Sequence, residues 1–225
     1  MKTVRKSVWF QATKSKGSVS GLLLNPEDAA WLLVFAHGAG AGMRHPFMEA
    51  MARSLADRRI ATFRYQFPYM EQNTKRPDPP RILLATVRAA IEKAANLVPD
   101  LPLIAGGKSM GGRMTSTAAS GSALPGVKGL VFFGFPLHAP GSPSADRAVH
   151  LFNVSLPMLF LQGTRDSLAD LSFLKPVCTK LGSHATLHIV EGADHSFRMP
   201  KRGAKSDDEA REDLAGTVAA WCGGL

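Results

Sequence analysis

Residues 106–112 read GGKSMGG, a glycine-rich stretch that directly follows the apolar run LPLIAG. Two chemistries use such a stretch, because glycine loops expose N–H groups to nucleotide phosphates and tight turns present a serine as a nucleophile. A phosphate loop reads G-x-x-x-x-G-K-[ST], which requires glycine at the position that Pro102 occupies. Residues 103–106 are also strand-like, where a phosphate loop needs exposed backbone. The spacing therefore disfavours a nucleotide site.

The alternative motif, G-x-S-x-G, is met by residues 107–111, with Ser109 at its centre. It lies between a predicted strand and a helix-like segment at 114–120, which is the strand-turn-helix context of a nucleophile elbow. Gly107 and Gly111 supply the space that the strained turn needs. We therefore predict that Ser109 is a nucleophile; the alternative is an ordinary turn in which Ser109 caps the helix.

The composition predicts one globular domain over residues 1–225, since 45% of the residues are hydrophobic and 20% are charged. The two cysteines exclude a disulfide framework. The N-terminal stretch turns polar rather than apolar, and no apolar run is long enough to cross a membrane, so we expect a cytoplasmic protein without membrane contact. The net charge of +9 is scattered along the chain, which disfavours a nucleic-acid partner.

Short apolar runs alternate with helical patterns through most of the chain. The first two strands are predicted to form an antiparallel hairpin joined through Lys16 and Gly17. The later runs suit strands that are buried on both faces, as in a parallel sheet covered by helices. This order predicts a doubly wound α/β fold with helices on both faces of a mostly parallel sheet. The later runs are WLLVFA (31–36), IATFRY (60–65), LPLIAG (101–106), GLVFFG (129–134), LPMLFLQG (156–163) and ATLHIVEG (185–192).

A serine in a nucleophile elbow needs a histidine as base and a carboxylate that orients it. In proteins with this motif, the Asp or Glu comes after the serine in the sequence and the His comes last, each just past a later strand. Asp166 comes after the strand at 156–163, and His195 after the strand at 185–192. We predict Asp166 as the acid and His195 as the base. Asp194 is the backup for the acid, and His138 competes for the role of base.

An oxyanion hole is expected from the N–H groups of Met110 and Ala39, because they follow the nucleophile and the first central strand. His37 is expected to orient the loop formed with Gly38 and Gly40. Residues 37–43 do not fit a dinucleotide fingerprint, since Met43 stands where that motif has Gly or Ala.

The segments HGAG, GGKSMGG, LQGTRD and GADHSF resemble the α/β-hydrolase superfamily across nearly the whole chain. GGKSMGGRM, FFGFPLHAPG and PMLFLQGTRD are most similar to its small lidless members: dienelactone-hydrolase-like proteins and the family of testis-expressed and acetyltransferase-complex subunits. The resemblance implies about eight strands and assigns nucleophile, acid and base to Ser109, Asp166 and His195. Dienelactone hydrolases use cysteine where this chain has Ser109, so their lactone substrate does not carry over.

We therefore expect a serine hydrolase of esters or related acyl bonds that needs no metal or organic cofactor. The stretch from Phe135 to Ser155 is too short for a cap domain, which predicts a shallow, exposed site for a small acyl ester. Loop position makes Met43, Phe135 and His138, together with Phe67 and Tyr69, candidates for the pocket wall, and packing in the core is the alternative for the aromatic residues. The alternative function is a binding or scaffold module that keeps the fold without turnover. The oligomeric state does not follow from the sequence.

Overall fold

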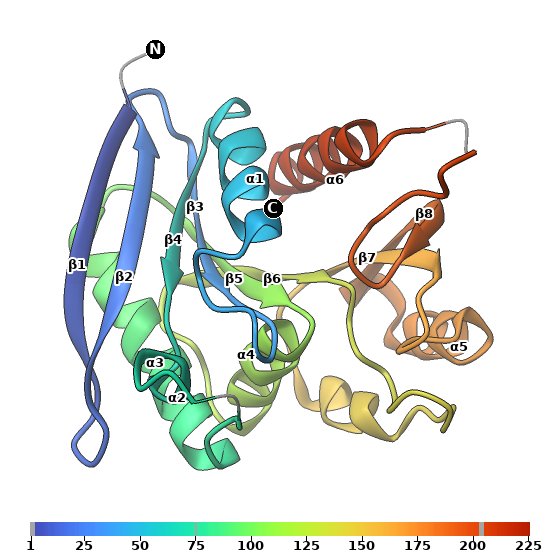
Figure 1. The fold of residues 1–225 in the computed structure, drawn as a ribbon, viewed down its shortest axis with the longest axis horizontal. Coiled ribbons are helices and arrows are strands. Elements are labelled where there is room, and N and C mark those ends of the chain that lie inside the picture. Colours follow the sequence, from blue (N-terminus) through green and yellow to red (C-terminus); the bar gives the residue numbers. More distant parts are fainter. Residues whose placement is uncertain (1–2, 75, 203–204) are drawn as a thin grey trace.

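A computed structural model describes residues 3–74, 76–202 and 205–225. Its centre is an eight-stranded sheet with the order β1-β2-β4-β3-β5-β6-β7-β8 (Figure 1). Strand β2 pairs antiparallel with both of its neighbours, and all pairs from β4 to β8 are parallel. The predicted mostly parallel sheet is thereby confirmed. The strands are β1 Thr3–Thr13, β2 Gly17–Pro26, β3 Trp31–Ala36, β4 Ile60–Tyr65, β5 Leu103–Lys108, β6 Val127–Phe133, β7 Met158–Arg165 and β8 Ala185–Asp194.

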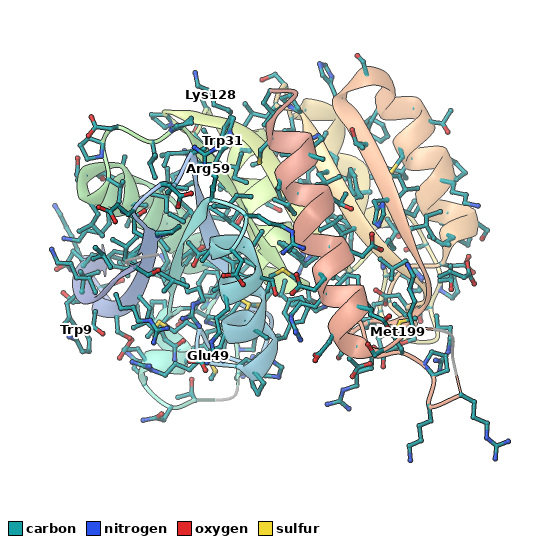
Figure 2. The ribbon with its side chains drawn as sticks, turned by 90° about the horizontal axis from the view of Figure 1, so that it is seen from above. Trp9, Trp31, Glu49, Arg59, Lys128 and Met199 are labelled. Atoms are coloured by element: carbon teal, nitrogen blue, oxygen red, sulfur yellow. The ribbon has the colours of Figure 1, made fainter. Side chains whose placement is uncertain are left out.

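Helices cover both faces of the sheet, as the sequence predicted. Helices α1 and α6 lie side by side on one face (Figure 2) and enclose one hydrophobic cluster with the sheet. Helices α3, α4 and α5, with the 3-10 helix η1, pack on the other face around a larger cluster. Their bounds are α1 Pro46–Ala56, α2 Pro68–Glu71, α3 Pro80–Leu97, α4 Met110–Gly121, η1 Asp146–Asn153, α5 Leu171–Leu181, η2 Gly182–His184 and α6 Asp207–Cys222.

Local sequence explains where several elements begin. The predicted hairpin of β1 and β2 forms, with a turn over residues 14–16 that includes Lys16, and Gly17, the first residue of β2, has a φ of 76°. Pro80 begins α3, where its missing N–H costs no helical hydrogen bond. Ser206 and Glu209 form a capping box at the start of α6.

The parallel pairing brings the carboxyl ends of β3, β5, β6, β7 and β8 to one edge of the sheet. The loops that follow these strands therefore meet, although they are far apart in the chain. Between β6 and β7 the described chain holds only η1 and irregular loops, so the fold has no cap domain there. Among the described helices, none is both long and apolar enough to cross a membrane.

Candidate active site

Ser109 occupies a strained turn between β5 and α4. Its φ of 50° and ψ of −119° lie where residues with a side chain are rarely found. A Cβ atom on Gly111 would approach the carbonyl oxygens of Ala36 and His37 to 2.6 Å, and one on Gly107 would collide with the Ala36 oxygen. Both glycines are therefore required for the turn to pack against the end of β3. The turn raises the Ser109 side chain at the carboxyl edge of the sheet.

Three side chains from three loops form a continuous hydrogen-bonded chain. The Ser109 hydroxyl lies 2.9 Å from His195 Nε2, and His195 Nδ1 lies 2.7 Å from Asp166 Oδ2. Ser109 follows β5, Asp166 follows β7, and His195 follows β8. The His195 side chain is 22% exposed and that of Asp166 only 1%. With Nδ1–H donating to the carboxylate, Nε2 is free to accept the serine proton.

The Asp166 carboxylate is held by two further donors. The Leu168 N–H donates to Oδ1 at 2.8 Å, and the Gln162 side-chain amide donates to Oδ2. Gln162 is fully buried on β7, and its Oε1 accepts the Phe135 N–H at 3.0 Å. Sequence reasoning passed over Gln162. The available signal was one amide in the otherwise apolar run LPMLFLQG.

The competing acid and base are occupied elsewhere. Asp194 Oδ1 accepts the N–H groups of Ser196 and Arg198, so its carboxylate caps the turn that carries His195. His138 is buried, with Nδ1 donating to the Ala139 carbonyl and Nε2 accepting the Asp170 N–H at 3.0 Å. Neither side chain hydrogen-bonds to Ser109.

His37 organises the loop after β3. Its Nδ1–H donates to the Gly38 carbonyl at 2.7 Å, and its Nε2 accepts the Phe67 N–H at 3.1 Å. Complete burial lowers the pKa of His37 to about 4, although the bond to Gly38 opposes the shift. The ring is neutral at pH 7 and both nitrogens are engaged. This geometry suits the orienting role expected for His37.

Two backbone N–H groups close to Ser109 in the chain or in space have no hydrogen-bond acceptor among the described residues. Gly38 lies against the serine, since its Cβ position is 3.6 Å from the Ser109 Cβ. The next residue, Ala39, is exposed, and its N–H meets no acceptor in the described part of the chain. Met110 is the first residue of α4, where an N–H has no helical acceptor. Tyr69 supports the loop by accepting the Gly40 N–H at 3.2 Å, a contact that sequence reasoning did not anticipate.

Lys108 places an ammonium group next to the carboxylates of this site. Its Nζ is sealed from solvent and has no hydrogen-bond partner among the described residues. The rings of Phe47 and Phe197 lie 5.9 and 5.6 Å from it. Burial lowers the pKa of Lys108 to about 8, while the charges of Asp166 and Asp194 oppose the shift.

A cleft of about 630 Å³ lies over Ser109 and His195. Most of its walls are apolar, and its charged lining residues are Lys108, Arg198, Asp207, Asp208 and Arg211. Within the described chain, no cluster of three or more histidine, cysteine or acidic residues is arranged to hold a metal ion. The apolar lining residues are Ala39, Ala41, Pro46, Phe47, Met48, Ala50, Leu168 and Phe197.

None of the residues expected in the pocket wall is among the residues that line this cleft. Phe135 is buried against Phe132 and Phe160, and the His138 ring is fixed by its two backbone contacts. Met43 lines a neighbouring hollow instead. These residues follow strand ends, as the sequence indicated, but their side chains point into the core or to another surface.

A family model described as "Alpha/beta hydrolase domain" matches residues 29–223. The chain belongs to the α/β-hydrolase family. The match extends from just before β3 to the end of α6, and it includes the three loops that carry Ser109, Asp166 and His195.

Solved α/β-hydrolase structures share the fold over nearly the whole chain. A dienelactone hydrolase from Anabaena variabilis superposes with a TM-score of 0.80 at 19% identity, covering 100% of this chain and 99% of its own. A serine hydrolase described as "without lid", from Xanthomonas campestris, gives 0.74 at 19% identity, covering 98% and 96%. The esterase domain of a Rhodothermus marinus protein gives 0.72 at 16% identity, covering 99% and 98%. At these identities the likeness concerns the fold.

Proposed function

We propose that this α/β-hydrolase is a serine esterase that cleaves small acyl esters through Ser109, His195 and Asp166. The observation that carries the proposal is the pair of contacts at 2.9 and 2.7 Å that links the serine hydroxyl to the histidine and the histidine to a buried carboxylate. A serine becomes nucleophilic only when a base accepts its proton, and this chain of contacts supplies the base and its orienting acid.

In the acylation step, His195 Nε2 takes the hydroxyl proton while Ser109 Oγ bonds to the substrate carbonyl carbon. The carbonyl oxygen becomes an oxyanion, for which the N–H groups of Ala39 and Met110 are the proposed donors. His195 then gives the proton to the leaving alcohol oxygen as the carbon–oxygen bond breaks. Asp166 stabilises the transient imidazolium and keeps its Nε2 directed at the serine.

In the deacylation step, water replaces the alcohol. His195 removes one proton from the water as its oxygen attacks the acyl carbon, and the same oxyanion donors hold the second intermediate. Its collapse breaks the bond to Ser109 Oγ, which takes back the proton from His195. The products are a carboxylic acid and the starting enzyme, so the cycle requires no cofactor.

The cleft argues for a small or flexible acyl group. Its walls are mostly apolar, and within the described chain the segment between β6 and β7 adds no cap over it. Phe47 and Phe197 stack at 5.8 Å and form part of its lining. An apolar wall suits an acyl chain, whereas an uncapped site suits substrates that need no enclosure. We further propose that the chain acts as one domain in the cytoplasm.

A fluorophosphonate probe tests the proposal, because it labels an activated serine whatever the natural substrate is. We expect the intact protein to be labelled, and Ser109→Ala and His195→Ala to remain unlabelled while circular dichroism shows both folded. Ser196→Ala is the matched control, because Ser196 also lines the cleft but its hydroxyl makes no hydrogen bond among the described residues, and this variant should label normally. Absence of labelling in well-folded intact protein would favour a non-catalytic scaffold on the same fold.

A further inference from the structure

One end of the sheet is uncovered on the face that carries α1 and α6. These two helices pack over the central and C-terminal strands, whereas β1 and β2 lie at the far end of the sheet (Figure 1). A hollow of about 220 Å³ remains between β1, β2, β4 and the first turns of α1. It shares no lining residue with the cleft over Ser109. It is therefore a separate candidate site.

The lining of this hollow is strongly basic. Four arginines and Lys6 are among its lining residues, whose only carboxylate is that of Glu49. Lys6 alternates with Arg5 along β1, so its side chain is directed to the other face of the sheet, with those of Val8 and Phe10. Arg44 and Arg53 are exposed at its rim. The leucines of β2 complete the lining of the hollow, so the protein offers few hydrogen-bond acceptors to these cations. The basic residues are Arg5, Lys6, Arg44, Arg53 and Arg64.

Arg64 carries the argument because its charge is buried. Its side chain is only 10% exposed, and its Nη1 donates to the Met43 carbonyl at 3.1 Å. Its Nε is sealed from solvent and meets no acceptor, and no hydrogen bond of Nη2 is found among the described residues. Nη2 is thus the donor left for the hollow, since a guanidinium carries five N–H groups.

The available counter-charge is insufficient. Glu49 lies 3.8 Å from Arg64 and also 3.8 Å from Arg53, so two guanidinium groups share one carboxylate at long range. Burial depresses the pKa of Arg64, and repulsion from Arg44 and Arg53 adds to the effect against the opposing charge of Glu49. A buried cation without a close partner is costly, and a bound anion would offset that cost.

We propose that this hollow binds the phosphate group of a small phosphate-bearing molecule. A guanidinium group can donate two parallel hydrogen bonds to two oxygens of one phosphate. A phosphate dianion also neutralises more of the excess positive charge than a carboxylate does. The volume of about 220 Å³ equals roughly seven water molecules at ~30 Å³ each, enough for a phosphate and the first atoms attached to it. This inference is independent of the esterase proposal.

The site lies close to the loop that holds the proposed oxyanion donor. A second hollow, lined by Arg44 and Ala41 among others, continues from the basic one, and Ala41 also lines the cleft over Ser109. Met43, whose carbonyl accepts from Arg64, belongs to the same loop. The loop that contains Ala41 and Met43 thus connects the proposed phosphate site to the cleft over Ser109.

Titration calorimetry with inorganic phosphate and with phenyl phosphate, in low-salt buffer free of other multivalent anions, tests the proposal. We expect saturable binding with one site. Arg44→Gln combined with Arg53→Gln should weaken it about tenfold or more, since charge-assisted bonds are lost, and Arg64→Met should weaken it similarly. Glu49→Gln should strengthen it, because it removes the one carboxylate among the lining residues of the hollow.

Arg59→Gln is the matched control. Arg59 is exposed, pairs with Asp28, and lies beyond the opposite end of α1 from Glu49 (Figure 2), so its loss should leave binding unchanged. Equal weakening by Arg59→Gln, or no saturable binding, would overturn the site. Binding to vesicles that contain phosphatidic acid without binding of either free phosphate would also overturn it in favour of a membrane surface. If Arg64→Met fails to fold, the exposed pair Arg44 and Arg53 still decides the outcome.

Discussion

Lys108 carries a buried ammonium group next to the candidate site, and its burial affects the stability of the protein. The residue lines the cleft, while its Nζ is sealed from solvent without a hydrogen-bond partner in the described chain. Its pKa falls from 10.5 to about 8 on folding. The folded state therefore binds fewer protons than the unfolded chain between about pH 8 and 10.5. The free energy of unfolding therefore rises with pH across that window. Below about pH 8 the buried lysine is charged, and its full destabilising effect is present.

The first prediction follows from this destabilising effect. Lys108→Met should stabilise the protein at pH 7 by on the order of 2 to 3 kcal/mol, because it removes a buried cation and keeps the apolar stem. The gain should shrink toward pH 10, where the wild-type lysine is largely neutral. Urea unfolding at both pH values measures it, with Lys128→Met, an exposed lysine on β6, as control (Figure 2). A variant no more stable than the wild type at pH 7 would contradict it.

A second residue-scale prediction concerns Gln162, which links Asp166 to the backbone of Phe135. Gln162→Met leaves the Phe135 N–H buried without an acceptor, so stability should fall by about 1 to 3 kcal/mol. Asp166 also loses one of its donors, and fluorophosphonate labelling of Ser109 should slow about tenfold because His195 is held less firmly. Gln11→Met, on the exposed side of β1, should change neither quantity. Normal labelling by Gln162→Met would show that Leu168 alone orients the carboxylate.

At the scale of elements, the junction of β5 and α4 is where local sequence says most. The motif at 107–111 predicted a strand, a sharp turn and a helix, and the structure has all three because only glycine fits at both ends of the turn. Local sequence says much less about neighbours in space. The order β2-β4-β3-β5 follows from long-range pairing, and the inward packing of Phe135 and His138 depends on it, so their side-chain directions were not predictable from position after a strand.

The third prediction compares two glycines near this junction, one that is required because a side chain would collide with β3 and one that only lowers helix propensity. Gly107→Ala places a methyl group against the Ala36 carbonyl and should destabilise the protein by about 1 to 3 kcal/mol or more. Gly121→Ala, at the exposed end of α4 with open space around its Cβ position, should instead stabilise by about 0.5 to 1 kcal/mol. Thermal unfolding of the two variants gives shifts of opposite sign. A neutral Gly107→Ala would mean that the end of β3 moves away freely.

At the scale of the whole molecule, the parallel sheet is what assembles the candidate site. The sequence placed Ser109, Asp166 and His195 each just past a strand, and parallel strands bring such positions to one edge. The supporting contacts from Gln162, Tyr69 and Lys108 come from side chains whose directions depend on packing between distant segments. They therefore escaped prediction. The catalytic roles, the single domain over residues 1–225 and the cytoplasmic location stay predictions.

The buried His37 and the half-buried His150, which lie in different parts of the fold, make its stability depend on pH in the acid range. His37 lies under the loop after β3, and His150 lies on η1, where its Nε2 contacts the Ser116 hydroxyl at 2.8 Å. Burial lowers the pKa of each to about 4, and the charge of Arg113 adds to the shift of His150. The unfolded chain, with histidines near 6.5, binds more protons between pH 6.5 and 4. Stability must therefore fall as the pH drops through that window.

The final prediction gives this fall a magnitude and a test. Because His37 is fully buried, its contribution should be on the order of 3 kcal/mol by pH 4, and the partly exposed His150 should contribute less. Urea midpoints measured from pH 7 to 4.5 should decrease steadily, and His150→Phe should show a shallower decrease than the wild type. His184→Gln, an exposed histidine, should follow the wild-type curve. A flat profile over this range would mean that both rings already accept protons in the folded state, which would require the backbone contacts of His37 to open without loss of the fold.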